Sequence, residues 1–201
     1  MRKIGVLYSG SSHQYRTFTE PKYRQYLAEL LYLPTFDEVD LNGFDVLLVP
    51  SQLHRELVTQ HLPKIHAFLN SGKIVMALGA QHNPWFSGHN WETRPTNFWW
   101  WLEPGAKSGL MVKTPTHDLF RYITLNDATW HYHGVFFPQQ EEESLIEVEN
   151  DGSIFFIDKK STGGTLILTT LDPEYHYGSY FMPATERFLN GVLPWLAEGV
   201  I

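Results

Sequence analysis

Short apolar runs alternate with amphipathic segments along the first part of the chain. Ile4 to Tyr8, Asp45 to Pro50 and Lys73 to Leu78 are dominated by aliphatic residues, and the first run ends in the polar loop Ser9-Gly10-Ser11-Ser12. Since neither face of such a run is consistently polar, the pattern predicts strands buried on both faces within a parallel sheet.

Three further segments carry apolar residues at intervals of three and four, which predicts helices packed against that sheet. The first spans Pro21 to Leu31, the second closes at Asn70-Ser71-Gly72, and the third begins at about Pro183. Their apolar faces consist of Tyr23, Tyr26, Leu27 and Leu30; Val58, Leu62, Ile65 and Leu69; and Phe188, Leu189, Val192 and Leu196. Pro194 should kink or end the last helix.

Alternating strands and helices indicate one α/β domain over residues 1–201, with a flavodoxin-like, doubly wound and mainly parallel sheet. Ser153 to Asp158 and Thr165 to Thr170 flank a Gly-containing turn and predict a small β-hairpin. Ligands of such folds bind outside the carboxyl ends of the strands. The loops after Tyr8, Val49 and Ala77 are therefore the expected site.

Composition removes several classes of function. The formal charge is −7, and the 15 basic residues are scattered, so a nucleic-acid partner is not expected. There is no cysteine, which excludes disulfides, thiolate metal ligands and thiol nucleophiles. The apolar start is too short for a signal peptide, and no run approaches the length that spans a bilayer. We expect a cytoplasmic protein without a membrane partner.

Two motifs resemble those of the class I glutamine amidotransferases. In that family a strand enters a turn of the form G-x-C-L-G-x-Q, and a later strand ends in F-H-P-E. This chain has Val75-Met76-Ala77-Leu78-Gly79-Ala80-Gln81 and Leu171-Asp172-Pro173-Glu174. The resemblance implies that Ala77 stands at the nucleophile position, Asp172 at that of the histidine base, and Glu174 at that of the orienting carboxylate. Because a methyl group cannot attack an amide, no glutaminase activity is expected.

The chain also resembles the trehalose-utilisation (ThuA-like) branch of the same fold. His13 follows the first strand, and the segment His117 to Ile123 is similar to that branch's H-P-l-x-x-g-l element, with Asp118 in place of proline. This resemblance implies that His13 faces the ligand. The segment Trp130 to His133 departs from the acidic stretch expected after that element.

His131 and His133 are two residues apart, so a strand at this point would place both on one face. They could then share a metal or an anionic ligand, with His82, Asp172 or His176 as a third group, or simply bond to backbone and carboxylates. A neighbouring carboxylate should raise the pKa of either histidine. The run Glu141 to Glu143 is interpreted as a solvated turn and not as a metal site.

Six of the seven tryptophans lie between residues 85 and 130: Trp85, Trp91, Trp99, Trp100, Trp101 and Trp130. Most belong to a long loop over residues 81–105 that could close over a ligand. Their rings could stack on sugars, pack a loop onto the sheet, or form a contact between protomers.

Together these patterns predict a non-glutaminase domain that binds a small polar ligand, such as a carbohydrate. The candidate catalytic residues are Asp172, Glu174, His131 and His133. The candidate ligand-binding residues are His13, Ser51, Gly79, Gln81, His82, Trp85, Trp130 and His176. No cofactor is required, and a metal through His131 and His133 is the less favoured interpretation. Two other functions stay open: a ThuA-like hydrolase or isomerase acting on a sugar-like substrate, and a structural protein, such as a homo-oligomer, that uses the Trp-rich loop as an interface.

Overall fold

The computed structural model describes residues 1–79, 88–95, 102–139, 142–180 and 182–201. Within these residues a ten-stranded mixed sheet has the strand order β2-β1-β3-β4-β10-β9-β7-β5, and β8 pairs with β9 and β6 beside this path. Its first five strands are parallel and follow the order 2-1-3-4-5 of flavodoxin-like folds: β1 (Ile4–Tyr8), β2 (Leu27–Tyr32), β3 (Val46–Val49), β4 (Ile74–Ala77) and β10 (Thr165–Thr169). The predicted fold class is confirmed.

The rest of the sheet is antiparallel. It contains β5 (Trp91–Thr93), β6 (Leu110–Val112), β7 (Gly134–Phe136), β8 (Glu143–Val148) and β9 (Ser153–Asp158). The strands β9 and β10 pair antiparallel, with Asp158 opposite Leu166, as the predicted hairpin requires. Because β9 runs against β10, Asp158 lies at the end of the sheet where the parallel strands begin.

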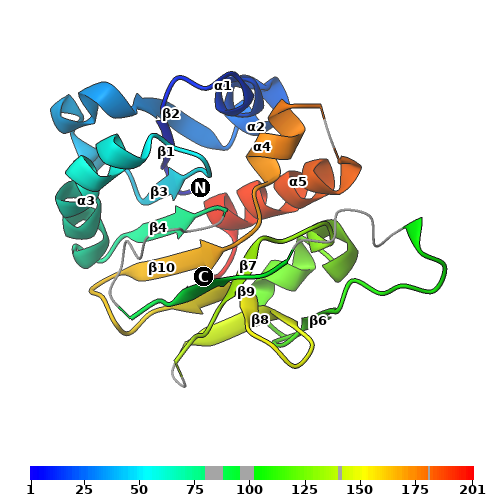
Figure 1. The fold of residues 1–201 in the computed structure, drawn as a ribbon. Coiled ribbons are helices and arrows are strands. Elements are labelled where there is room, and N and C mark those ends of the chain that lie inside the picture. The colour runs from blue at the N-terminus through cyan, green and yellow to red at the C-terminus, as the bar shows by residue number, and fades with distance from the viewer. Residues whose placement is uncertain (80–87, 96–101, 140–141, 181) are drawn as a thin grey trace.

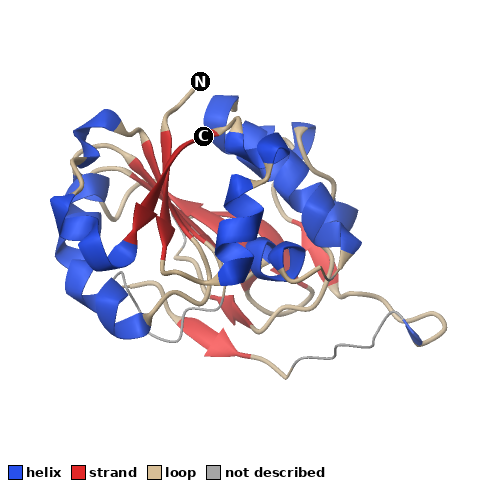
Figure 2. Ribbon diagram, turned by 90° about the horizontal axis from the view of Figure 1, so that it is seen from above, coloured by secondary structure: helices blue, strands red, loops and turns tan. Residues whose placement is uncertain are grey.

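Helices cover both faces of the sheet (Figures 1 and 2). The helix α3 (Arg55–Asn70) packs on one face, and the other face is covered by α1, α4 and α5. The remaining helical elements are α1 (Ser12–Thr19), α2 (Pro21–Arg24), α4 (Pro173–Gly178), α5 (Pro183–Glu198), and the 3₁₀ turns η1 (Leu33–Glu38), η2 (Leu41–Gly43), η4 (Asp118–Arg121) and η5 (Leu125–Ala128). No helix within the described residues is long and apolar enough to cross a membrane.

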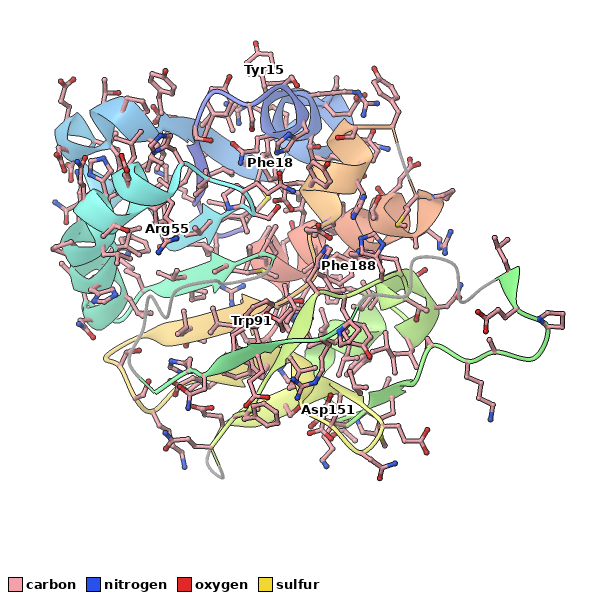
Figure 3. All side chains as sticks on the ribbon, viewed as in Figure 1. Tyr15, Phe18, Arg55, Trp91, Asp151 and Phe188 are labelled. Carbon is pink, nitrogen blue, oxygen red and sulfur yellow. The ribbon has the colours of Figure 1, made fainter. Side chains whose placement is uncertain are left out.

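The alternation of side chains along the buried strands creates two cores. Met76 and Leu78 face α1 and α5, whereas Val75 and Ala77 face α3. On α1, Phe18 is fully buried beneath the exposed Tyr15 (Figure 3). Both faces of the strands are apolar because helices cover both, which explains the continuous apolar runs in the sequence.

The predicted helix over residues 21–31 is wrong in its second half. Only α2 is helical, and β2 pairs in parallel with β1 at the edge of the sheet. In β2, Leu27 of the predicted helical face is buried together with Leu31, whereas Leu30 of that face is only partly buried. Backbone pairing with β1 decides between helix and strand, and a local period cannot report it.

Pro194 was predicted to kink or end the last helix, and the helix does not end there. The helix α5 continues to Glu198. The proline removes the bond to the carbonyl of Asn190, and because Asn190 is exposed, water can replace the missing donor.

Candidate functional site

The carboxyl end of β10 positions the principal carboxylate of the site. After β10 the chain passes through Leu171, whose carbonyl accepts a 2.8 Å bond from the Gly79 nitrogen. This bond joins the exits of β10 and β4. Asp172 then occupies the N-cap position of α4 without a side-chain capping bond, and its side chain is buried beside the strand ends.

Three histidines converge on Asp172. One turn further along α4, His176 places Nε2 3.3 Å from Asp172 Oδ1. His131 Nε2 lies 3.1 Å from His176 Nε2, and His133 Nε2 lies 3.8 Å from Asp172 Oδ2. Trp130 Nε1 donates a 3.3 Å bond to Asp172 Oδ1. We name Asp172, His131, His133 and His176 the histidine cluster.

Residues 130–133 do not form a strand. The prediction that His131 and His133 share one face assumed that they do. They form an irregular segment, and β7 begins only at Gly134. The rings of His131 and His133 nevertheless lie with their centroids 5.1 Å apart. The irregular segment brings the two rings together, so their proximity does not come from the alternation of side chains along a strand.

Burial and neighbouring charges set the protonation of His131 and Asp172. Burial, supported by the neighbouring His176, lowers the pKa of His131 to about 4. Burial would raise the pKa of Asp172, but its bond from His176 and the charges of His176 and His133 hold it below its ordinary value. The expectation of a raised histidine pKa is therefore wrong for His131, because desolvation outweighs the carboxylate. At neutral pH the cluster contains a neutral imidazole beside a carboxylate.

One atom each from His131, Asp172 and His176 could bind a metal ion together. These atoms lie within 4.8 Å of one another, and all three residues are buried. Two imidazole nitrogens and one carboxylate oxygen are donors that divalent transition metals accept. His133, whose side chain is 35% exposed, is the more accessible partner of the buried Asp172 carboxylate.

Glu174 is directed to a different partner. Its Oε1 accepts a 2.5 Å bond from the backbone nitrogen of Ser51, and Gln14 Nε2 donates to the carbonyl of Ser51 at 2.8 Å. Glu174 is fully buried, and burial together with the charge of Asp172 raises its pKa to about 7. Glu174 thus holds the loop after β3 close to α4.

The turn after β4 differs from a nucleophile elbow. Ala77 is the last residue of the strand and its side chain packs into the core under α3, while the positive φ of +83° falls at Gly79. A Cβ at Gly79 would lie 2.4 Å from Ser51 Cβ. The glycine therefore allows the exits of β3 and β4 to touch.

The other predicted ligand-binding residues fall into three groups. His13 lies in the first turn of α1 with its ring 5.1 Å from that of Tyr175, and burial lowers its pKa although Asp172 opposes this. Trp130 is buried against Phe188, so its ring is not available for stacking on a ligand, and it acts on Asp172 instead. Gln81, His82, Trp85 and Trp99 to Trp101 lie outside the described residues, as does much of the proposed lid.

A second group of polar residues escaped the sequence analysis. His89 Nε2 lies 3.0 Å from Asp158 Oδ2 and 3.2 Å from Glu142 Oε1, and the three side chains are almost completely buried. Glu142 is therefore not part of a solvated turn. Its carboxylate meets His89 and Asp158 only through the pairing of β8 with β9, which no local pattern announces.

The chain matches no known protein-family model and no curated protein sequence. Solved structures share its fold. Cytoplasmic Protein STM1381 from Salmonella typhimurium LT2 superposes with a TM-score of 0.60 at 10% identity, over 98% of this chain and 100% of that one. A putative GMP synthase protein from Thermoplasma acidophilum gives 0.56 at 13% identity, over 98% and 96%. The beta-galactosidase of Bacillus circulans sp. alkalophilus gives 0.55 at 12% identity, over 98% of this chain but 31% of its own. At these identities the likeness, including that to a glutamine amidotransferase family, shows the fold alone.

Proposed function

We propose that this chain is a cytoplasmic, degenerate amidotransferase-like domain that binds a small polar ligand at the histidine cluster and does not hydrolyse glutamine. One observation carries the proposal: Asp172 gathers three histidines at the end of the sheet where ligands of this fold class bind. Polar side chains that converge at such a place are the usual mark of a binding site.

The absence of glutaminase activity follows from chemistry. The chain has no cysteine, and the two residues at the positions of nucleophile and base are Ala77 and Asp172. In addition, the Glu174 carboxylate accepts a hydrogen bond from the backbone nitrogen of Ser51 and so holds the loop after β3. Ammonia release from glutamine by purified protein, lost in Asp172→Asn, would contradict this part of the proposal.

A carbohydrate or another hydroxylated molecule is the class of ligand we propose. His133 and His13 are the partly accessible groups, and imidazoles with a carboxylate can both donate to and accept from hydroxyl groups. Two structural neighbours, a beta-galactosidase and an exo-beta-1,4-mannosidase, are named for sugar substrates, although this chain covers only 31% and 36% of them. These names motivate the choice of compounds for the test.

The test is a thermal-shift screen of monosaccharides, amino acids and small carboxylates, followed by calorimetry. A compound at about a hundred times its Kd should add about 2.7 kcal/mol to the free energy of unfolding of the wild type. His133→Ala should abolish that gain. The control is His61→Ala, since His61 lies on α3, which covers the opposite face of the sheet, and contacts the exposed Asp37. Equal stabilisation of wild type and His133→Ala by every hit would refute the site.

One observation favours a second candidate function, a ThuA-like hydrolase or isomerase. The partly exposed His133 places Nε2 3.8 Å from Asp172 Oδ2, a pairing that would orient this imidazole as a general base. Release of p-nitrophenol from p-nitrophenyl glycosides would reveal hydrolysis. His133→Ala should then abolish turnover; turnover that survives this substitution would exclude the role of His133.

A further inference from the structure

Two donor–donor distances within the histidine cluster fit a common metal ion. Two donor atoms bound to one ion at about 2.1 Å, with angles between octahedral and tetrahedral values, lie about 3.0 to 3.4 Å apart. His131 Nε2 and His176 Nε2 are separated by 3.1 Å, and His176 Nε2 and Asp172 Oδ1 by 3.3 Å. Both separations fall within that interval.

Hydrogen bonding alone satisfies these contacts poorly. His176 Nε2 carries at most one hydrogen, yet it faces His131 Nε2 on one side and Asp172 Oδ1 on the other. If His131 donates to His176, then His176 turns a lone pair toward the carboxylate, which is repulsive. If His176 donates, one hydrogen must serve both acceptors. A cation removes the conflict because all three atoms can present lone pairs to it.

The surroundings also suit a metal. Trp130 Nε1 donates to Asp172 Oδ1 and fixes the carboxylate in place, as outer partners of metal ligands do. The three donors come from two separate parts of the fold, the segment before β7 and α4 with its N-cap residue, and the core residues Trp130 and Leu171 flank them. His133, which is 35% exposed and lies 3.8 Å from Asp172 Oδ2, connects this buried group to solvent.

We propose that His131, Asp172 and His176 bind one divalent transition-metal ion of the zinc type, leaving a coordination position open beside His133. Such an ion would contact the oxygen atoms of the ligand. This role rests on the proposed function, whereas binding of the ion itself does not. The set differs from the predicted pair of His131 and His133, because His176 places Nε2 3.1 Å from His131 Nε2 and shares the Asp172 carboxylate.

The experiment uses the full chain, purified without a histidine tag and stripped with a chelator. Zinc is titrated by calorimetry, and cobalt is added to a parallel sample to record its visible absorption bands. We expect zinc binding tighter than about 1 µM and intense cobalt bands typical of low coordination number. Asp172→Asn, which preserves shape, and His176→Ala should each weaken binding by at least about tenfold.

Two controls assign the ion. His61→Ala removes a histidine that also lies 3.0 Å from a carboxylate but belongs to no group of three donors within the described residues, so binding should be unchanged. His89→Ala removes the other group of three donors. Zinc binding that survives Asp172→Asn and disappears in His89→Ala would overturn the proposal, as would no binding in the wild type. If hits from the ligand screen still require His133 in metal-free protein, the proposed function stands and only the metal fails.

Discussion

Substitution of Gly79 by alanine tests the contact that holds the strand exits together. The added Cβ would lie 2.4 Å from Ser51 Cβ, about 1 Å inside ordinary van der Waals contact, and the φ of +83° disfavours any side chain. The backbone conformation should cost about 1 to 2 kcal/mol and the overlap about 1 to 3 kcal/mol. We therefore expect a total loss of about 2 to 5 kcal/mol in the free energy of unfolding.

Gly72 provides a matched control. It follows α3 with nearly the same φ of +85°, but a Cβ there would meet no atom closer than 3.9 Å. Gly72→Ala should thus cost only the backbone contribution of about 1 to 2 kcal/mol. Urea unfolding of wild type and both variants gives the difference, provided the slope with denaturant is unchanged. If Gly79→Ala destabilises no more than Gly72→Ala, the exits of β3 and β4 are not in rigid contact.

Three other predictions concern the core and buried polar groups. Phe188→Ala removes a fully buried ring that packs on Trp130 and should cost about 3 to 5 kcal/mol; a loss below about 1 kcal/mol in urea unfolding would contradict this core. Glu174→Ala leaves the Ser51 nitrogen without its acceptor and should lower the free energy of unfolding by about 2 to 4 kcal/mol. Glu174→Gln keeps an oxygen at this place and should cost clearly less. Equal losses in the two variants would argue against the bond. His117 is an N-cap whose pKa burial lowers from 6.5, so the unfolded chain takes up its proton first as pH falls. The stability that its neutral form supplies is complete above about pH 6.5 and lost below it. His117→Asn keeps a cap but cannot titrate, so its unfolding free energy should fall less than that of the wild type between pH 7 and 5; parallel curves would refute this.

Most of the parallel half of the fold could be predicted from the sequence, because its strands are buried on both faces. Their apolar runs and the face of α3 follow directly from that burial. The strand β2 could not be predicted from the sequence, since the spacing of its leucines also satisfies a helical period. Only the pairing with β1 makes this segment a strand. The antiparallel strands β5, β6 and β7 have three residues each, and β5 and β6 pair with strands far along the chain.

The sequence predicted which residues belong to the site better than it predicted which of them touch. Asp172 and the three histidines were candidates, but His131 lies 3.1 Å from His176, and burial lowers its pKa although the Asp172 carboxylate opposes this. Desolvation depends on which atoms surround a ring, and no spacing along the chain reports that. The group around His89 was missed for the same reason.

The most direct measurement of the central claim is a proton–nitrogen NMR spectrum of the histidine rings during titration with a hit from the ligand screen. Substitution of single histidines assigns the signals. We predict that the compound shifts the ring signals of His131, His133 and His176, leaves that of His61 unchanged, and has no effect on these rings in Asp172→Asn. A hit that shifts other histidines while these three stay unchanged would contradict the proposal that the histidine cluster is the binding site.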